Sequence, residues 1–508
     1  MTRANAAPWV PRGKADRLGI AAFLIANVAF FIVLALGYGI GGGADSRLLY
    51  LVMLFAVCAS SLIGLDGWNG RYALQAMTMA VYFLYFGIEP LVGVFEGKAI
   101  DAGGSVLSVT EGVILVGGVF TVLGYRIAAT IFSAKSARAA PRDWPLATIV
   151  IIGVALWAAG TYATYYWYFH VVTDTTNEAT RRGLASLSEL RITLLILAQL
   201  VQPLGVLLLA YAWRVHRSLT FALALASVVA LQVVLGFIID IKGTALLGGV
   251  LVIVAIILID GRIPVGWLAG AFVFVQLTFP LFQAYREFIR GDLGEARTTV
   301  LQNLGSVFDR VLSESHEVTK GPDRAQTFFE RMSLYGSVQM IVTRTGVDVP
   351  YQHGYTLIPL ISTFVPRIIW PGKPDIEAGQ LVNKAFHVSQ EAATYISPSH
   401  LGELYWNFGW PGVVLGMSLI GFLFGFIGAR FNLREGRTVT RLLVTVVTLH
   451  YVIQGIEGTI AVSYVVWLRS LAAIGLLHLA FARVRVARTV VGVDERIAER
   501  RAFPNLLD

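Results

Sequence analysis

Long uninterrupted apolar runs are the feature that most constrains what this chain can fold into. The run from Leu18 to Ile40 is one example, and similar runs recur along most of the sequence. An α-helix needs about 20 apolar residues to cross a bilayer, and only helices or closed barrels satisfy the backbone in lipid. Apolar residues are continuous within the runs rather than alternating with polar ones, which favours helices over a barrel. The sequence therefore predicts an all-α polytopic integral membrane protein.

Composition leads to the same conclusion. The 508 residues are 56% hydrophobic and only 14% charged, whereas soluble domains carry about 25% charged residues. An ordinary globular protein is therefore excluded. The first apolar run is too long for the core of a signal peptide, so we expect it to be retained as a first span. The single cysteine, Cys58, permits no disulfide within the chain.

We predict twelve transmembrane helices, and the last two form the least regular pair. Only the segment "QGIEGT" separates them. It is read either as a tight turn or as a break in one longer hydrophobic region. The predicted spans are 18–40, 48–65, 72–95, 110–133, 145–168, 192–214, 219–239, 245–260, 264–282, 409–429, 442–456 and 459–481.

The distribution of Lys and Arg predicts the orientation. Loops on the same side as the N-terminus hold roughly three times as many basic residues as the short loops opposite, and cytoplasmic loops retain positive charge. Both termini are therefore predicted to be cytoplasmic, and most of the net charge of +8 is a topology signal. The basic tail 483–508 is either solvated or touches anionic headgroups.

One long polar segment, 283–408, falls on the opposite, outer side between helices 1–9 (1–282) and helices 10–12 (409–482). It is too long for a passive connector. Apolar residues at helical spacing predict two amphipathic helices in its first part, and Pro322 suits the first turn of the second. We expect the two stripes to be packing faces. They comprise Val300, Leu304, Val307 and Val311, and then Ala325, Phe328, Met332, Tyr335 and Val338.

Several motifs are absent from the sequence. It has no GxxxxGK[ST] phosphate loop, no CxxC or HExxH metal pattern and no GxSxG nucleophile elbow. We therefore expect neither an ATP-driven motor in this chain nor a bound metal or other cofactor.

Basic residues on the outer side contradict the charge bias and form the first candidate site. Clustered guanidinium and ammonium groups suit a phosphate or pyrophosphate. The alternative is that each pairs with a nearby acid, as Asp240 does with Lys242 in this interpretation. The predicted pyrophosphate-binding residues are Arg181, Arg182, Lys242, Arg286, Arg290, Arg367 and Lys373.

A second candidate group combines an acid and two histidines. His353, His400 and Glu403 are the predicted catalytic residues, because histidine or glutamate can take a proton from a hydroxyl near neutral pH. Histidines in loops are also ordinary surface residues. Glu403 equally fits a charge that meets the dipole at the start of the tenth span.

Polar and aromatic residues around Glu403 give two further interpretations. Tyr405, Trp406, Phe408 and Trp410 fit an interfacial aromatic belt, and they also fit a platform on which sugars stack. The predicted sugar-binding residues are Trp370, Tyr405, Trp406 and Asn407.

Two stretches, "FVPRIIWPGKP" (364–374) and "GELYWNFGWPGVVLGMSLIGFLFG" (402–425), carry a family resemblance. The chain resembles the bacterial Wzy-type oligosaccharide repeat-unit polymerases, both in these motifs and in having about a dozen spans with one large late loop. One position departs from the family pattern. Members of the family often have an arginine in a "GSRG"-like sequence at the start of a mid-chain span, where this chain has Lys242 in "IKGT". The matching positions are Pro366, Arg367, Trp370, Pro371, Lys373, Pro374, Gly402, Glu403, Tyr405, Asn407, Phe408 and Gly409.

The resemblance implies a fold and a reaction. The fold would be like that of membrane-embedded glycosyltransferases of the GT-C class. The enzyme would join undecaprenyl-pyrophosphate-linked repeat units at the periplasmic face of the bacterial inner membrane, without metal or nucleotide. Its partners would be the lipid-linked glycan donor and acceptor, membrane lipids and a chain-length regulator protein. The basic residues would stabilise the leaving pyrophosphate.

Other functions remain open at this stage. An O-antigen ligase uses the same donor and a similar topology. A transporter or lipid-linked-sugar flippase would show charged, broken helices at mid-membrane and repeat symmetry. Arg126 and Arg469 are the candidates for intramembrane charge. A non-enzymatic scaffold would leave the outer basic residues unexplained.

Overall fold

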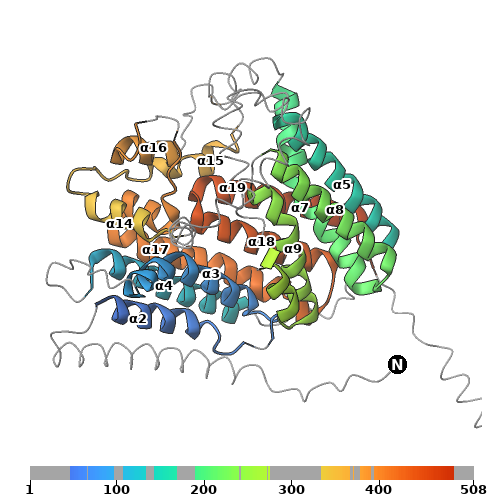
Figure 1. Cartoon of the computed structure of the whole chain (residues 1–508), viewed down its shortest axis with the longest axis horizontal. Helices are drawn as coiled ribbons and strands as arrows, with labels where there is room; N and C mark the ends of the chain where they lie inside the picture. Colours follow the sequence, from blue (N-terminus) through green and yellow to red (C-terminus); the bar gives the residue numbers. More distant parts are fainter. Residues whose placement is uncertain are drawn as a thin grey trace, which may run out of the picture.

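The structure is a computed structural model, shown in Figure 1. It describes residues 46–65, 67–95, 107–132, 142–168, 189–239, 242–271, 273–274, 333–365, 370, 378–390 and 394–484. Helices account for nearly all regular structure in this part of the chain, together with two very short strands.

The α-helices, in chain order, are α2 (Ser46–Ser60), α3 (Ala73–Phe95), α4 (Val109–Phe132), α5 (Leu146–Tyr166), α7 (Glu189–His216), α8 (Leu219–Ile238), α9 (Lys242–Asp260), α14 (Tyr335–Arg344), α15 (Pro359–Ser362), α16 (Ala378–Phe386), α17 (Ser399–Phe431), α18 (Val439–Glu457) and α19 (Ile460–Phe481). Two 3-10 helices are η3 (Tyr355–Leu357) and η4 (Leu433–Glu435). Strands β1 (Arg142–Asp143) and β2 (Arg483–Val484) pair antiparallel.

Within the described residues, eight helices are long and apolar enough to cross a membrane. Each corresponds to a predicted span. Two further predicted spans, 48–65 and 245–260, match the shorter apolar helices Leu49–Ser60 and Ala245–Asp260. The predicted span 18–40 lies outside the described residues, and the span 264–282 is described only as far as residue 274. By the length and hydropathy of its helices the chain is a multi-pass, all-α membrane protein.

The helices form two groups, visible at the left and right of Figure 1. Helices α2, α3 and α4 pack with α17, α18 and α19, while α5, α7, α8 and α9 pack together beside them. The most extensive contacts join α4 to α17 and α5 to α7. Glycines make the first of these possible: a Cβ on Gly421 would overlap the carbonyl of Thr121, and one on Gly124 the carbonyl of Ser418. Small residues are the usual means of close helix packing in lipid, where no hydrophobic force drives helices together.

Hydrogen bonds define one end of the bundle, called here the Asp143 end. The Asp143 carboxylate accepts from Tyr211 Oη (3.0 Å) and from the Val439 N–H (3.1 Å), which opens α18. In the same region Arg434 N–H donates to Asn69 O (3.0 Å). The short loops predicted to be cytoplasmic therefore meet at this end.

The opposite end, called the Glu403 end, gathers segments predicted to lie outside. Leu334 N–H donates to Tyr85 O (3.0 Å), and Tyr85 Oη donates to Glu457 Oε2 (3.0 Å). Glu403 bonds to both Thr356 and Ile460. Segments predicted to lie on the outer side therefore meet at this end.

Arg126, a candidate intramembrane charge, serves as a helix cap. Its guanidinium donates to Ser60 O (2.8 Å) and Ile63 O (2.7 Å) at the C-terminal end of α2, and lies 5.2 Å from the centre of the Tyr72 ring. The last carbonyls of a helix have no partner within it. The Arg126 bonds add to the turn that follows α2, in which Ser60 O also accepts from the Ile63 N–H (3.1 Å). Arg126 therefore has a structural role here. Arg469 is half-buried on α19.

The long segment 283–408 differs from its prediction in two ways. Helix α14 begins at Tyr335, and Ser333 and Leu334 before it are not helical. The prediction of one continuous helix that contains both Met332 and Val338 is therefore wrong. The residues of the first predicted amphipathic helix lie outside the described part. At the other end of the segment, residues 399–408 are helical and buried, and so belong to the bundle.

Candidate functional site

Helix α17 consists of two helices that meet at Gly409. This residue has φ 62° and ψ −145°, a conformation that suits glycine and interrupts the helix. Beyond the break, Gly412 and Gly416 both face Leu404, so closely that a Cβ on Gly412 would overlap the Leu404 carbonyl oxygen. In a continuous helix, residues eight apart are separated by about 12 Å. The chain therefore folds back at Gly409, and α17 has a short arm (399–408) and a long arm (410–431).

The short arm enters the bundle. Trp410, at the break, lies against Gly112 near the start of α4, whereas Leu401 lies against Gly117, further along α4. His400 lies against Gly455 of α18 and stacks on Tyr464 of α19. Residues 399–407 are all buried. Irregular backbone inside a membrane protein is tolerated where protein covers it, and the surrounding helices provide that cover.

Glu403 is completely buried in the middle of the short arm, and both of its carboxylate oxygens are hydrogen-bonded. Oε1 accepts from Thr356 Oγ1 (2.7 Å), and Oε2 accepts from the Ile460 N–H (2.7 Å). Ile460 is the first residue of α19, where N–H groups lack partners within the helix and a negative charge is stabilising. The predicted helix-dipole contact thus exists, but with α19 rather than with the tenth predicted span. Glu403 joins three elements: the short arm, η3 and α19.

Asn407 continues this network at the end of the short arm. Its Nδ2 donates to Thr356 Oγ1 (2.7 Å) and to Glu403 O (2.7 Å), and its Oδ1 accepts from the Gly354 N–H (2.8 Å). Asn407 is fully buried. It therefore holds the structure together and is not presented to a sugar.

The loop before η3 caps the short arm. Gln352 N–H donates to Trp406 O (3.0 Å), and His353 N–H donates to Asn407 O (3.1 Å). His353 and Gly354 both have positive φ, 47° and 88°. These bonds satisfy the last carbonyls of the short arm. The loop and the motif around Glu403 consequently form one unit, although they are distant in sequence.

The two predicted catalytic histidines have opposite environments. His400 is 2% exposed, its ring centre lies 5.3 Å from that of Tyr464, and its Nε2 has no hydrogen-bond partner. His353 is exposed at the Glu403 end. Of the three predicted catalytic side chains, His353 is therefore the one that solvent or a substrate can reach.

The predicted sugar-binding aromatic residues also differ in exposure. Trp406 is 1% exposed and packs edge-on against Phe386 at 5.4 Å, and Tyr405 is buried too. Their burial leaves neither ring face free for stacking. Trp370 is 40% exposed, and so is Trp410 beside the break.

The predicted pyrophosphate-binding residues cannot be placed in this site. Lys242 is the first residue of α9, and its side chain lies outside the described part of the structure. The remaining six, Arg181, Arg182, Arg286, Arg290, Arg367 and Lys373, lie outside the described residues.

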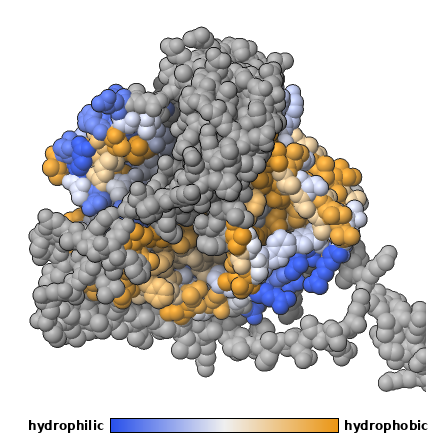
Figure 2. Space-filling model, viewed as in Figure 1, coloured by the Kyte–Doolittle hydropathy of each residue, from blue (hydrophilic) through white to orange (hydrophobic). Residues whose placement is uncertain are grey.

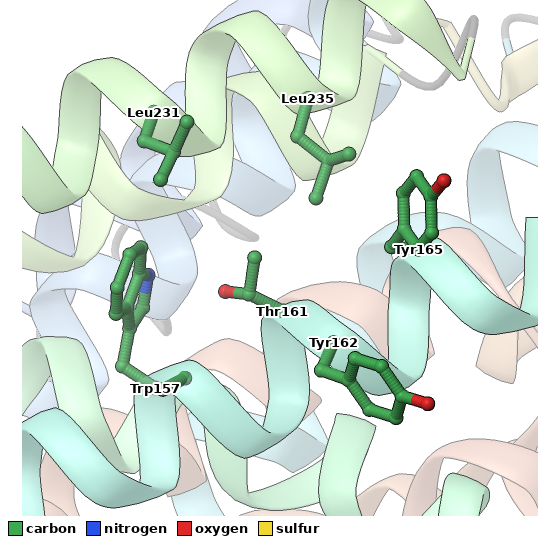
Figure 3. A pocket seen from close by; sticks show the side chains of 7 residues that line it. Trp157, Thr161, Tyr162, Tyr165, Leu231 and Leu235 are labelled. Carbon is green, nitrogen blue, oxygen red and sulfur yellow. The ribbon is translucent and has the colours of Figure 1, made fainter.

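An apolar groove of about 390 Å³ lies in the second helix group, between α5 and α8 (Figure 3). Trp157, Tyr162 and Tyr165 line it from α5, and Leu231 and Leu235 from α8. Thr161, also in its wall, accepts a hydrogen bond from Gln202 Nε2 (2.9 Å). Because most of the surfaces of α5 and α8 face away from the protein interior, the groove belongs to the surface that lipid would cover.

Two residues central to this site were not among the predicted site residues, although Gly409 is one of the positions that carry the family resemblance. Thr356 bridges Glu403 and Asn407, and nothing in its sequence surroundings distinguishes it from other loop threonines. Gly409 carried a stronger signal: with Pro411 it interrupts "NFGWPG" where polar residues give way to an apolar run. Proline is favoured in the first turn of a helix, which is where Pro411 lies in the long arm.

Comparison with known families supplies one match. Residues 172–436, more than half of the chain, match the family described as Domain of unknown function (DUF8712). The chain belongs to this family. The DUF8712 region includes the loop before η3, the short arm and every predicted site residue. No curated protein and no solved structure matches the chain.

Proposed function

We propose that this protein is a membrane-embedded glycosyltransferase that joins polyprenyl-pyrophosphate-linked oligosaccharide repeat units into a longer polymer. The observation that carries the proposal is the short arm of α17. The motif "GELYWNFG", which carries much of the resemblance to repeat-unit polymerases, folds back into the bundle, and the loop 352–356 is hydrogen-bonded to it. A rigid unit of this kind suits a site that must hold a reacting group in place.

In this proposal the buried residues hold the site in place, and the exposed residue takes part in the reaction. Glu403 and Asn407 hold the loop that presents His353. The acceptor hydroxyl attacks the anomeric carbon of the donor glycan, the bond from that carbon to the pyrophosphate oxygen breaks, and a glycosidic bond forms. His353 accepts the hydroxyl proton. The polyprenyl pyrophosphate leaves, and its charge is stabilised by the predicted arginines, with Arg367 first among them.

The orientation of the protein in this proposal follows from the distribution of Lys and Arg among the loops. The Asp143 end, which gathers the Lys- and Arg-rich loops, faces the cytoplasm, and the Glu403 end faces the periplasm of a bacterial inner membrane. The apolar groove between α5 and α8 offers a surface for a hydrocarbon tail (Figure 3). A chain-length regulator would be a partner of the same complex.

A transporter is the second candidate, because a broken helix inside a bundle is also typical of substrate sites in transporters. The polar side chains of Glu403 and Asn407 argue against this alternative, since each is already bonded within the protein. They leave no carboxylate or amide oxygen directed at a transported solute.

The decisive experiment follows glycan length in cells that lack the protein. Loss of a polymerase leaves acceptors that carry a single repeat unit. Loss of a ligase or an exporter leaves no attached glycan. Purified protein should lengthen lipid-linked repeat units in vitro without nucleotide, and failure to do so with a well-folded preparation would exclude the polymerase.

A further inference from the structure

Residues 355–364, which form η3 and α15, have an inverted distribution of polar and apolar side chains. Ile361 is 73% exposed, Phe364 50% and Tyr355 43%, whereas Thr356 and Ser362 are buried. Leu357 and Leu360 do pack against the core. In water an element of this size would turn its small hydroxyl residues outward and its largest apolar residues inward. The outer side of this segment therefore does not suit water.

The neighbouring helices α14 and α16 show the normal, water-facing pattern. They bury Val338, Ile341, Val382 and Phe386, and they expose Gln339, Thr343 and Lys384. Just after α14, Asp348 is exposed and accepts a hydrogen bond from Arg344 Nε (2.8 Å), which lowers the pKa of Asp348. The hydrophilic area at the upper left of Figure 2 lies over this part of the molecule.

Residues 355–364 contact a membrane span that also exposes apolar side chains. Both η3 and α15 contact α19. Helix α19 exposes Val462 (54%) within its first turn and Leu468 (43%) further along. The segment therefore contacts a membrane span that itself exposes apolar side chains, one of them near the Glu403 end.

We propose that residues 355–364 form an interfacial segment that lies in the bilayer at the boundary between headgroups and acyl chains. Its occupant is the lipid that already surrounds α19. Tyrosine and tryptophan are enriched at this depth, which fits Tyr355 and the 40% exposed Trp370 that follows. An isolated apolar face inserts into this boundary in the same way in amphipathic helices that lie on membranes.

The interfacial segment is mechanically linked to the candidate site. Thr356, on its buried side, donates to Glu403 and accepts from Asn407. Lipid contact on one side of the segment therefore fixes the position of the loop that carries His353. This link holds whatever reaction the site performs.

Spin-label accessibility in the full-length protein tests the proposal. Cys58 is the only cysteine and is buried, so labels can be placed by single substitutions such as Ile361→Cys and Phe364→Cys. Val347→Cys, 85% exposed after α14, is the matched water-facing control, and Leu468→Cys on α19 is the lipid-facing control. The protein is reconstituted in phospholipid vesicles, and collisions with oxygen and with a water-soluble nickel chelate are measured.

The labels at 361 and 364 should collide with the nickel chelate several-fold less than the label at 347. Their ratio of oxygen to nickel collisions should lie between the ratios at 347 and at 468, because oxygen concentrates toward the bilayer centre and the segment lies at the boundary. Nickel accessibility equal to that at 347 would overturn the proposal, because the segment would then face water. Protection from both reagents would also overturn it, because a second copy or another part of the chain would then cover the segment. A Cys58→Ala background repeats the measurement without the native thiol.

Discussion

The two arms of α17 adjoin in sequence but are held in the protein by different forces. The long arm is apolar, exposes Leu415 and Leu419, and packs on α4 through glycines. The short arm is buried through residue 407 and is tied by hydrogen bonds to η3 and α19. Shape complementarity positions the long arm, and pairing of buried polar groups positions the short arm. Substitutions should therefore act on the two arms in different ways.

The largest loss of stability is expected from Gly421→Leu in the long arm. The new side chain would overlap the backbone of α4 at Thr121. Because backbone cannot move aside easily, we expect a cost at or above the upper end of the about 1–3 kcal/mol typical of overpacking. Thermal unfolding in detergent and recovery of monodisperse protein measure the effect. Gly475→Ala on α19 is the control, because nothing lies within 4 Å of the added Cβ. Equal stability of the two variants would show that α4 and α17 are not packed through these glycines.

Glu403→Ala should have the next largest effect. It leaves the Ile460 N–H and the Thr356 hydroxyl buried without their acceptor, at about 1–3 kcal/mol for each group. Glu403→Gln retains one acceptor oxygen and should cost less. The free energy of unfolding is measured for both, together with polymerisation. A glutamine variant with normal stability but at least about a hundredfold loss of rate would show that Glu403 takes part in the reaction.

His400→Phe should change stability by less than about 1 kcal/mol, because the ring stack on Tyr464 is kept and a buried nitrogen without a partner is removed. Polymerisation should also continue. Loss of activity in a variant of unchanged thermal stability would contradict the packing role and make His400 a participant in the reaction.

His353→Ala should have the smallest effect on stability, within about 0.5 kcal/mol, because the side chain is exposed. Its effect on polymerisation should nevertheless be about a hundredfold or more if it accepts the proton. Rates with purified protein and lipid-linked repeat units measure this. His387→Ala, another exposed histidine with positive φ, provides a matched control.

The sequence predicted the long arm well and the short arm poorly, for a physical reason. Hydropathy over a window detects the apolar run that begins at Gly409, and the predicted span starts at the residue where the helix breaks. The direction of the short arm depends on partners 47 and 57 residues away, Thr356 and Ile460. No local pattern contains that information.

Burial divides the candidate side chains into two groups. Glu403, Asn407 and Trp406 were selected because polar and aromatic residues at the start of a span are unusual. The same unusual residues serve equally well as a buried hydrogen-bond network and a packed aromatic pair. Residue type therefore drew attention to this stretch, and the structure adds the exposure that separates its buried side chains from His353.

The bond between Glu403 and Ile460 has a consequence for biosynthesis. Thr356 leaves the ribosome first, Glu403 follows, and Ile460 comes 57 residues later. At about 5–20 residues per second, roughly 3–11 seconds pass between the synthesis of Glu403 and that of Ile460, whose N–H is the second hydrogen-bond donor to the Glu403 carboxylate. The short arm consequently gains its bond to α19 only after α19 has been made, so synthesis of α19 completes the hydrogen bonds that hold Glu403.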